Sequence, residues 1–255
     1  MNQYFLFLIG FYFVFSPVQG ISQQDDLVNK LWVDGQHFYD KGEFDKAVGV
    51  YQKLLSKRSS SEELFYNLGS AYYRLGRKGE AMAALLAARF LAPRDPDILF
   101  NLRHVHTQIQ DQLDIKPGAS VWETVFFWTS TTTIKELALG GLLLFILAWL
   151  CLLFAKLKNS SFFRIGYVFL ALSFVIAGAC SVSLSSEKHW GAITVKEASV
   201  RVGPSATSPL VFKLHEGAPF MVEGQQQGWL RIVLSDGQKG WVLEKEVAAF
   251  TYSRA

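Results

Sequence analysis

Two long runs without a charged side chain constrain this chain more than any other feature. Residues 137–155 form a run of nineteen residues, and residues 165–186 form a run of twenty-two. As helices that rise 1.5 Å per residue, they would be about 28 Å and about 33 Å long, enough to cross about 30 Å of hydrocarbon. The sequence therefore predicts two transmembrane helices joined by a short loop over residues 156–164.

The loop between the two runs predicts the orientation of this hairpin. It contains Lys156, Lys158 and Arg164 but no acidic residue, whereas the outer flanks of the hairpin carry both signs of charge. Because the basic residues of short loops stay on the cytoplasmic side, we expect this loop in the cytoplasm. The expected localisation is the inner, or cytoplasmic, membrane, with both large flanking segments extracytoplasmic (periplasmic).

The first twenty residues independently predict export. The apolar run from Tyr4 to Phe15 is too short to span a bilayer, and Val18 and Gly20 are small residues at the −3 and −1 positions of a cleavage site. We therefore expect residues 1–20 to be a signal peptide. The segment before the run has no Lys or Arg, so an uncleaved N-terminal anchor is the alternative.

Residues between the signal peptide and the hairpin repeat with a period of 34. The repeated positions include the pairs Gly35 and Gly69, Gly42 and Gly76, and Ala47 and Ala81. The motif Leu68-Gly69-x-x-Tyr72 resembles the tetratricopeptide repeat (TPR), an all-α solenoid of paired helices, while the first repeat departs from it with Asp34 in place of the leucine. We expect the first glycine of each repeat to let paired helices approach closely, and the second to end a helix in the left-handed conformation.

The TPR resemblance predicts a helical domain of minimal length. It covers residues 21–118, with repeats at about 28–61 and 62–95 and a capping helix over 96–114. Stacked repeats normally need about three units for stability, so we expect this array to require support from a partner or from the membrane. Residues 119–136, which include Trp122 and Trp128, are expected to form an interfacial linker before the first span.

The segment over residues 190–250 changes to short, alternating β-rich runs separated by glycine-containing turns. Its motifs are Val200-Arg201-x-Gly203-Pro204-Ser205, Gly228-Trp229 and Asp236-Gly237-x-x-Gly240-Trp241-Val242. In this order they resemble the bacterial SH3 (SH3b) family, a small all-β barrel. The resemblance implies binding of peptidoglycan peptides or other peptides, or support of a neighbouring domain. The predicted fold is thus a multidomain membrane protein with an all-α TPR solenoid, a two-helix transmembrane hairpin and an SH3-like barrel.

The TPR resemblance also implies a protein-binding groove along the first helix of each repeat. The expected groove residues are Trp32, Gln36, Tyr39, Tyr66, Ser70, Tyr73, Arg74 and Phe100. Aromatic side chains with polar neighbours are what peptide interfaces favour as hot spots. The alternative is that the capping helix or the Trp122–Trp128 segment covers these aromatic side chains. On the barrel, Trp229 and Trp241 are a possible SH3 groove, with core and rim packing as the alternative.

Small residues on the second run predict close helix packing. Ser173, Ala177 and Ser181 lie four residues apart and are expected to face the first span, with oligomerisation or docking on another membrane helix as the alternative. The two cysteines, Cys151 and Cys180, both lie inside the apolar runs. We therefore expect neither a structural disulfide nor a thiolate metal site.

The sequence lacks the residue patterns of an active site. No metalloprotease, paired-cysteine metal, phosphate-loop or serine-hydrolase motif occurs, so we expect no enzyme activity, no cofactor and no metal. The net charge is +3 without a basic cluster, which predicts no nucleic-acid partner. The expected partners are proteins, membrane lipid and, through the barrel, peptidoglycan.

The order of signal peptide, TPR pair, hairpin and SH3-like barrel resembles the BatE-type proteins of the aerotolerance (Bat) operons. This resemblance implies a scaffold in a cell-envelope complex linked to stress tolerance, with von Willebrand A-type and BatD-like membrane proteins as partners. The alternative from another class is a peptidoglycan-binding adaptor that recruits a cell-wall enzyme through its TPR repeats.

Overall fold

The computed structural model describes residues 22–57, 61–111, 113, 134–158, 162–185 and 188–252. The predicted signal peptide and all but the last three residues of the predicted interfacial linker lie outside the described residues. The chain divides into two compact units, residues 1–59 and residues 60–255, and each is described by itself.

Within residues 22–57, the described part of the first unit, the chain forms a pair of helices, α2 (Ser22–Asp40) and α3 (Phe44–Ser56). A Cβ on Gly35 of α2 would lie 2.5 Å from Cε1 of Tyr51 on α3, so only glycine allows this approach. Gly42 has φ +76° and joins the two helices, while Glu43 N–H donates to the carbonyl oxygen of Phe38 at 2.9 Å. Both roles predicted for glycine in the first repeat are confirmed.

The buried phenol of Tyr51 makes the stability of this helix pair depend on pH in the alkaline range. Burial raises the pKa of Tyr51 to about 12, with smaller contributions from Tyr39 and Asp40. Because the folded pKa exceeds the ordinary value of about 10, the neutral phenol stabilises the fold below pH 10, and this contribution is lost as pH rises through 12. In an alkaline titration followed by tyrosinate absorbance, Tyr51→Phe should remove only the component with a midpoint near pH 12. Loss of a component near pH 10 would contradict the burial of this phenol.

The second unit begins with three helices, α4 (Glu62–Arg74), α5 (Lys78–Leu91) and α6 (Pro96–His106). Gly69 repeats the role of Gly35, since its Cβ would lie 2.8 Å from Cγ of Leu85 on α5, and Gly76 repeats the φ of +76°. Helix α6 is shorter than the helix predicted over residues 96–114. It ends at His106, where the Thr107 hydroxyl donates to the carbonyl oxygen of His104 and the chain turns away.

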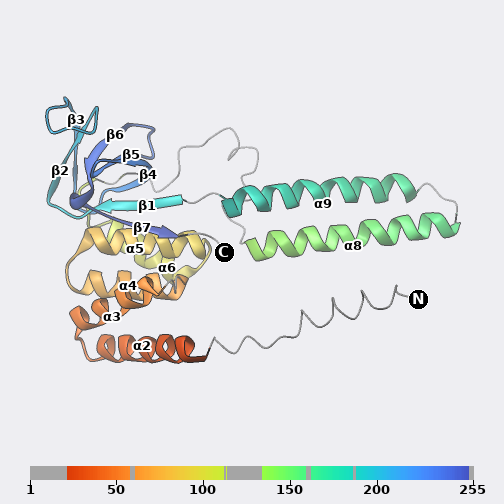
Figure 1. Ribbon diagram of the computed structural model, residues 1–255, viewed down its shortest axis with the longest axis horizontal. Helices are drawn as coiled ribbons and strands as arrows, with labels where there is room; N and C mark the ends of the chain where they lie inside the picture. Colours follow the sequence, from red (N-terminus) through yellow and green to blue (C-terminus); the bar gives the residue numbers. More distant parts are fainter. Residues whose placement is uncertain are drawn as a thin grey trace, which may run out of the picture. The chain divides into compact units, whose positions relative to one another are not determined.

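The middle of helix α5 is buried on every side because it packs between two layers. Its buried residues run without a break from Ala81 to Ala88, and Gly79 in its first turn is buried as well. One side contacts α4 and α6, and the other contacts strands β1 (Lys188–Ile193) and β7 (Val247–Tyr252) of the C-terminal barrel, as Figure 1 shows. The support expected from a partner or the membrane therefore comes from the chain's own barrel.

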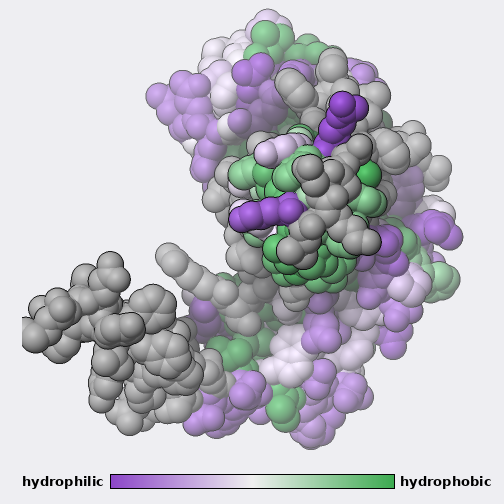
Figure 2. Space-filling model, turned by 90° about the vertical axis from the view of Figure 1, so that its right-hand side faces the viewer, coloured by the Kyte–Doolittle hydropathy of each residue, from purple (hydrophilic) through white to green (hydrophobic). Residues whose placement is uncertain are grey.

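The two apolar runs form helices α8 (Ile134–Lys158) and α9 (Phe162–Ser185), which pack side by side (Figure 1). Both are long and apolar enough to cross a membrane by length and composition. Figure 2 faces the α8–α9 turn and shows hydrophobic side chains gathered on the hairpin, where many leucine and phenylalanine side chains are exposed. This pattern is typical of helices that face lipid.

Small residues recur every seven positions where these two helices meet. On α8 they are Gly141, Ala148 and Ala155, and on α9 they are Gly166, Ser173 and Cys180. The Ser173 hydroxyl donates to the carbonyl oxygen of Gly141 at 3.1 Å, which confirms that Ser173 faces the first helix. The same prediction is wrong for Ala177 and Ser181, which are exposed, because a packed pair of helices follows a seven-residue and not a four-residue spacing. Both cysteines are free.

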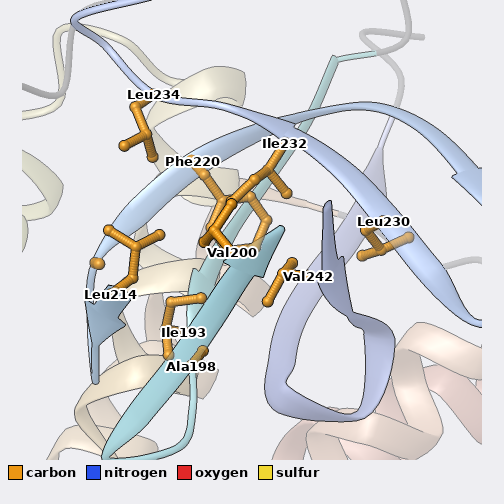
Figure 3. Packing of buried hydrophobic residues seen from close by; sticks show 10 residues of the cluster. Ile193, Ala198, Val200, Leu214, Phe220, Leu230, Ile232, Leu234 and Val242 are labelled. Carbon is orange, nitrogen blue, oxygen red and sulfur yellow. The ribbon is translucent and has the colours of Figure 1, made fainter. Parts of the chain in front are cut away.

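Over its described residues, 188–252, the C-terminal barrel has seven antiparallel strands in the order β3-β2-β6-β5-β4-β1-β7. Besides β1 and β7, the strands are β2 (Glu197–Arg201), β3 (Leu210–His215), β4 (Pro219–Gln226), β5 (Trp229–Val233) and β6 (Lys239–Leu243), with a short 3-10 helix η2 (Glu244–Glu246) before β7. Alternate residues point inward, and Figure 3 shows Val200, Phe220, Ile232 and their neighbours packed into one core. The sequence analysis missed β7, although its run Val247 to Phe250 is largely apolar.

Candidate functional site

Four side chains from α4, α6 and the turn after α6 form a hydrogen-bonded aromatic cluster. The Tyr73 hydroxyl and His104 Nε2 lie 2.8 Å apart, and Gln108 Nε2 donates to the Tyr73 hydroxyl at 2.7 Å. The His104 ring stacks on Phe100, with planes 4° apart and centroids separated by 6.3 Å. Phe100 is 65% exposed, so this cluster offers a flat aromatic surface with polar edges to a partner.

The structure therefore brings together two of the predicted groove residues, Tyr73 and Phe100. Tyr66 and Ser70 lie on the same helix as Tyr73 and are half-buried, and Arg74 is exposed at its end. Ser70 Oγ is buried and has no hydrogen-bond partner among the described residues. These positions remain predicted contacts of a ligand.

The three predicted groove residues of the first unit have different surroundings. The ring of Trp32 lies 6.3 Å from that of the core residue Tyr51, and Tyr39 packs edge-on against Phe44 at 5.3 Å. Gln36 is exposed on the same helix. Trp32 and Tyr39 thus contribute to the packing of this helix pair, whatever else they contact.

Sequence reasoning missed His104 and Gln108 as members of the cluster. They follow Phe100 at intervals of four residues, which places His104 above Phe100 on one helix face. Gln108 lies beyond the end of α6, and its backbone carbonyl accepts from Lys78 Nζ at 3.1 Å. The sequence shows the spacing of four residues, but it does not predict where α6 ends, and that end determines the position of Gln108.

The two candidate tryptophans of the barrel lie on its outer face. Leu230 and Val242 point into the core, so Trp229 and Trp241 on the same strands point outward by alternation. Trp229 is nevertheless only 8% exposed, which favours a packing role for this ring. Trp241 is half-buried, and in register it lies directly between Arg201 of β2 and Arg231 of β5.

Polar contacts join the helices to the barrel. Lys78 N–H, at the start of α5, donates to Glu216 Oε1 at 3.0 Å. His215 N–H donates to Asp111 Oδ2 at 2.6 Å, and His215 Nδ1 lies 3.0 Å from Asp111 Oδ1. Gln110 also reaches His215, with 3.3 Å between the two Nε2 atoms. These contacts hold the turn after β3 against both ends of the α5–α6 segment.

At two glycines, the helical segment and the barrel also approach each other closely. A Cβ on Gly79 would lie 2.1 Å from the carbonyl oxygen of Ile193, and one on Gly217 would lie 2.3 Å from Cγ2 of Ile109. Both glycines are therefore required for the helices and the barrel to meet. No group of three or more His, Cys, Asp or Glu side chains that could hold a metal occurs within the part of the chain that the structure describes.

Comparison with known families agrees with both folded parts. A TPR repeat profile matches residues 35–76, and a bacterial SH3 domain profile matches residues 196–248. No curated protein matches the chain. The chain thus carries a TPR region, which implies protein partners, and a C-terminal SH3b domain of a family whose members often bind peptidoglycan. Together these two domains suggest a binding or adaptor role.

Proposed function

We propose that this protein is a membrane-anchored, non-catalytic scaffold whose α4–α6 surface binds a segment of another envelope protein. The observation that carries the proposal is the cluster of Tyr73, Phe100, His104 and Gln108. Its exposed phenylalanine and hydrogen-bonded polar edge have the composition of a protein-interaction hot spot. A partner that covers Phe100 would bury apolar area now in contact with water.

The contact between α5 and the barrel supports a hairpin that returns to the side from which it started. Helix α5 precedes both apolar helices and strands β1 and β7 follow them, yet the three elements touch. Segments that touch must lie on the same side of a membrane, which favours two crossings. The basic residues Lys156, Lys158 and Arg164 then favour a cytoplasmic loop, with the helices and the barrel in the periplasm.

The proposed setting is a cell-envelope complex of the aerotolerance type. It rests on the resemblance in domain order to the BatE-type proteins, and the two matching profiles support that order in part. In this setting the partners of the α4–α6 surface are von Willebrand A-type or BatD-like membrane proteins. The hairpin would keep the adaptor within reach of such partners at the membrane surface.

Site-specific cross-linking in cells tests the scaffold. A photoreactive amino acid at Phe100 should form an adduct with one envelope protein, which mass spectrometry identifies. The paired change Tyr66→Ala and Tyr73→Ala should reduce this adduct at least ten-fold, since central aromatic contacts are worth about 2 kcal/mol or more each.

The control for this experiment is the same photoreactive residue at Glu244, an exposed position on the barrel. It should not capture the same protein. An adduct that forms equally at both positions, or that persists in the Tyr66→Ala, Tyr73→Ala variant at an unchanged melting temperature, would contradict binding at the α4–α6 surface.

A further inference from the structure

A row of three side chains crosses the outer face of the barrel. The register pairs Arg201 with Trp241 and Trp241 with Arg231, across strands β2, β6 and β5. Residues directly opposite each other on neighbouring strands point to the same face of a sheet. Trp241 is therefore flanked on both sides by an arginine, and we call these three residues the Arg-Trp-Arg row.

The Arg-Trp-Arg row carries a surplus of positive charge. Arg201 donates to the carbonyl oxygen of Ser208 at 2.7 Å and forms no ion pair within the described residues. Arg231 lies 3.4 Å from the carboxylate of Glu223, but Lys239 also bonds that carboxylate at 2.5 Å. One carboxylate thus pairs with two cations, and the Arg201 guanidinium is held by the Ser208 carbonyl without a carboxylate partner among the described residues.

The rest of the barrel helps to define this face as the one available to a ligand. Strands β1 and β7, at the other end of the sheet order, are in contact with α5. The row lies on β2, β6 and β5, where the side chain of Arg231 is 50% exposed and Trp241 is half-buried. A flat aromatic ring between two planar cations suits an apolar group with carboxylates on either side.

The spacing of the row selects the form of the ligand. Neighbouring strands lie about 4.8 Å apart, so the backbones that carry the two arginines are about 10 Å apart. An extended chain rises about 3.3 Å per residue and turns alternate side chains to one face, so residues four positions apart face the row about 13 Å apart with a third side chain midway between them. The long side chains of arginine and glutamate span the remaining difference of about 3 Å. A linear polypeptide that crosses the strands could thus place both carboxylates on the arginines and an intervening apolar side chain on the indole.

We propose that the Arg-Trp-Arg row binds an extended acidic segment of a partner protein. The segment carries two carboxylates about four residues apart, one paired with each arginine, and an apolar residue midway between them on Trp241. This second surface goes beyond the proposed function of the α4–α6 cluster and does not depend on it. It would allow the protein to hold two partners at once.

The test uses the full-length protein in detergent micelles and a fluorescent peptide that contains Glu-Ser-Leu-Ser-Glu. Fluorescence anisotropy should show saturable binding, with no binding of the Gln-Ser-Leu-Ser-Gln peptide. Arg201→Gln and Arg231→Gln should each weaken binding at least ten-fold at an unchanged melting temperature. Arg231→Lys should weaken it less, because the charge stays while the planar, two-pronged contact is lost.

The matched control is Lys213→Gln, because the side chain of Lys213 is also 50% exposed and also pairs with one acid, Glu197. Binding should be unchanged in this variant. An equal loss with Lys213→Gln would overturn the proposal, since attraction would then come from the general charge of the barrel. So would binding of soluble peptidoglycan fragments, but not of the glutamate peptide, at the Arg-Trp-Arg row.

Discussion

Replacing Gly79 with valine should separate the barrel from the helices. A Cβ at this position would lie 2.1 Å from the carbonyl oxygen of Ile193 and 2.7 Å from Cα of Thr194. Both are backbone atoms, and the Ile193 oxygen is also held by the N–H of Gly217 at 2.8 Å, so no side-chain rotation relieves the clash. We expect a loss of about 3 kcal/mol or more, the upper end for overpacking, because the contact must open.

Hydrogen exchange of the full chain in micelles measures this separation. In Gly79→Val, the amides of α5 should lose protection, while the amides of β1 and the other strands, which are paired within the barrel, should keep theirs. The control is Gly49→Ala on α3, where a Cβ meets no atom within 4 Å. That change should be neutral or stabilising by up to about 1 kcal/mol, since alanine is the better helix former. Unchanged protection of α5 in Gly79→Val would contradict the docked arrangement.

The second large effect is expected for Gly69→Leu, which should force α4 and α5 apart. A Cβ at Gly69 would already lie 2.8 Å from Cγ of Leu85 and 3.3 Å from the carbonyl oxygen of Ala81. A leucine adds three further carbons to this gap, so we expect a loss of about 3 kcal/mol and a lower melting temperature by circular dichroism. The Leu85 side chain can rotate away, whereas the carbonyl of Ala81 is backbone and cannot, so only part of the clash should be relieved.

A double-mutant cycle separates this explanation from a general loss of helix stability. Gly69→Ala should be destabilising alone, and Leu85→Ala should leave a cavity alone. Combined, they should cost less than the sum, because the smaller side chain at position 85 makes room for the new methyl group. Additive costs would mean that the two positions do not touch.

The period of 34 was sufficient to predict how each helix pair is built. Gly35 and Gly69 recur at one spacing because every pair needs the same close approach, and Gly42 and Gly76 recur because every pair needs the same left-handed turn. Both requirements act within one helix pair, so the residues that meet them recur in the sequence with every repeat.

The docking of the barrel depends on surfaces that are distant in sequence. Asp111 and His215 are separated by both apolar helices, and nothing in the repeat marks either as a contact. One signal was present: the middle of α5 is apolar on all sides, with Ala83, Ala84 and Ala87 buried as well as the positions that face α4. A helix of this composition needs a second layer, but the sequence does not identify that layer.

The candidate sites also contain some residues that the sequence predicts and others that only the structure identifies. Tyr73 and Phe100 could be predicted, since the TPR resemblance specifies which helix positions line a groove. Gln108 could not, because its place depends on where α6 stops. On the barrel, strand alternation puts Trp241 outside the core, but its neighbours Arg201 and Arg231 come from other strands and require the register.

The sidedness of three single cysteines tests the central claim, a helix–barrel unit on the outer side of a membrane, most directly. In a chain with Cys151 and Cys180 replaced by alanine, cysteines would be placed at Glu63, Lys156 and Lys245, all exposed. An impermeant maleimide applied to spheroplasts should modify positions 63 and 245 and leave 156 unmodified until the membrane is opened. Modification of only one of positions 63 and 245 would contradict the unit, and modification of 156 alone would contradict its orientation.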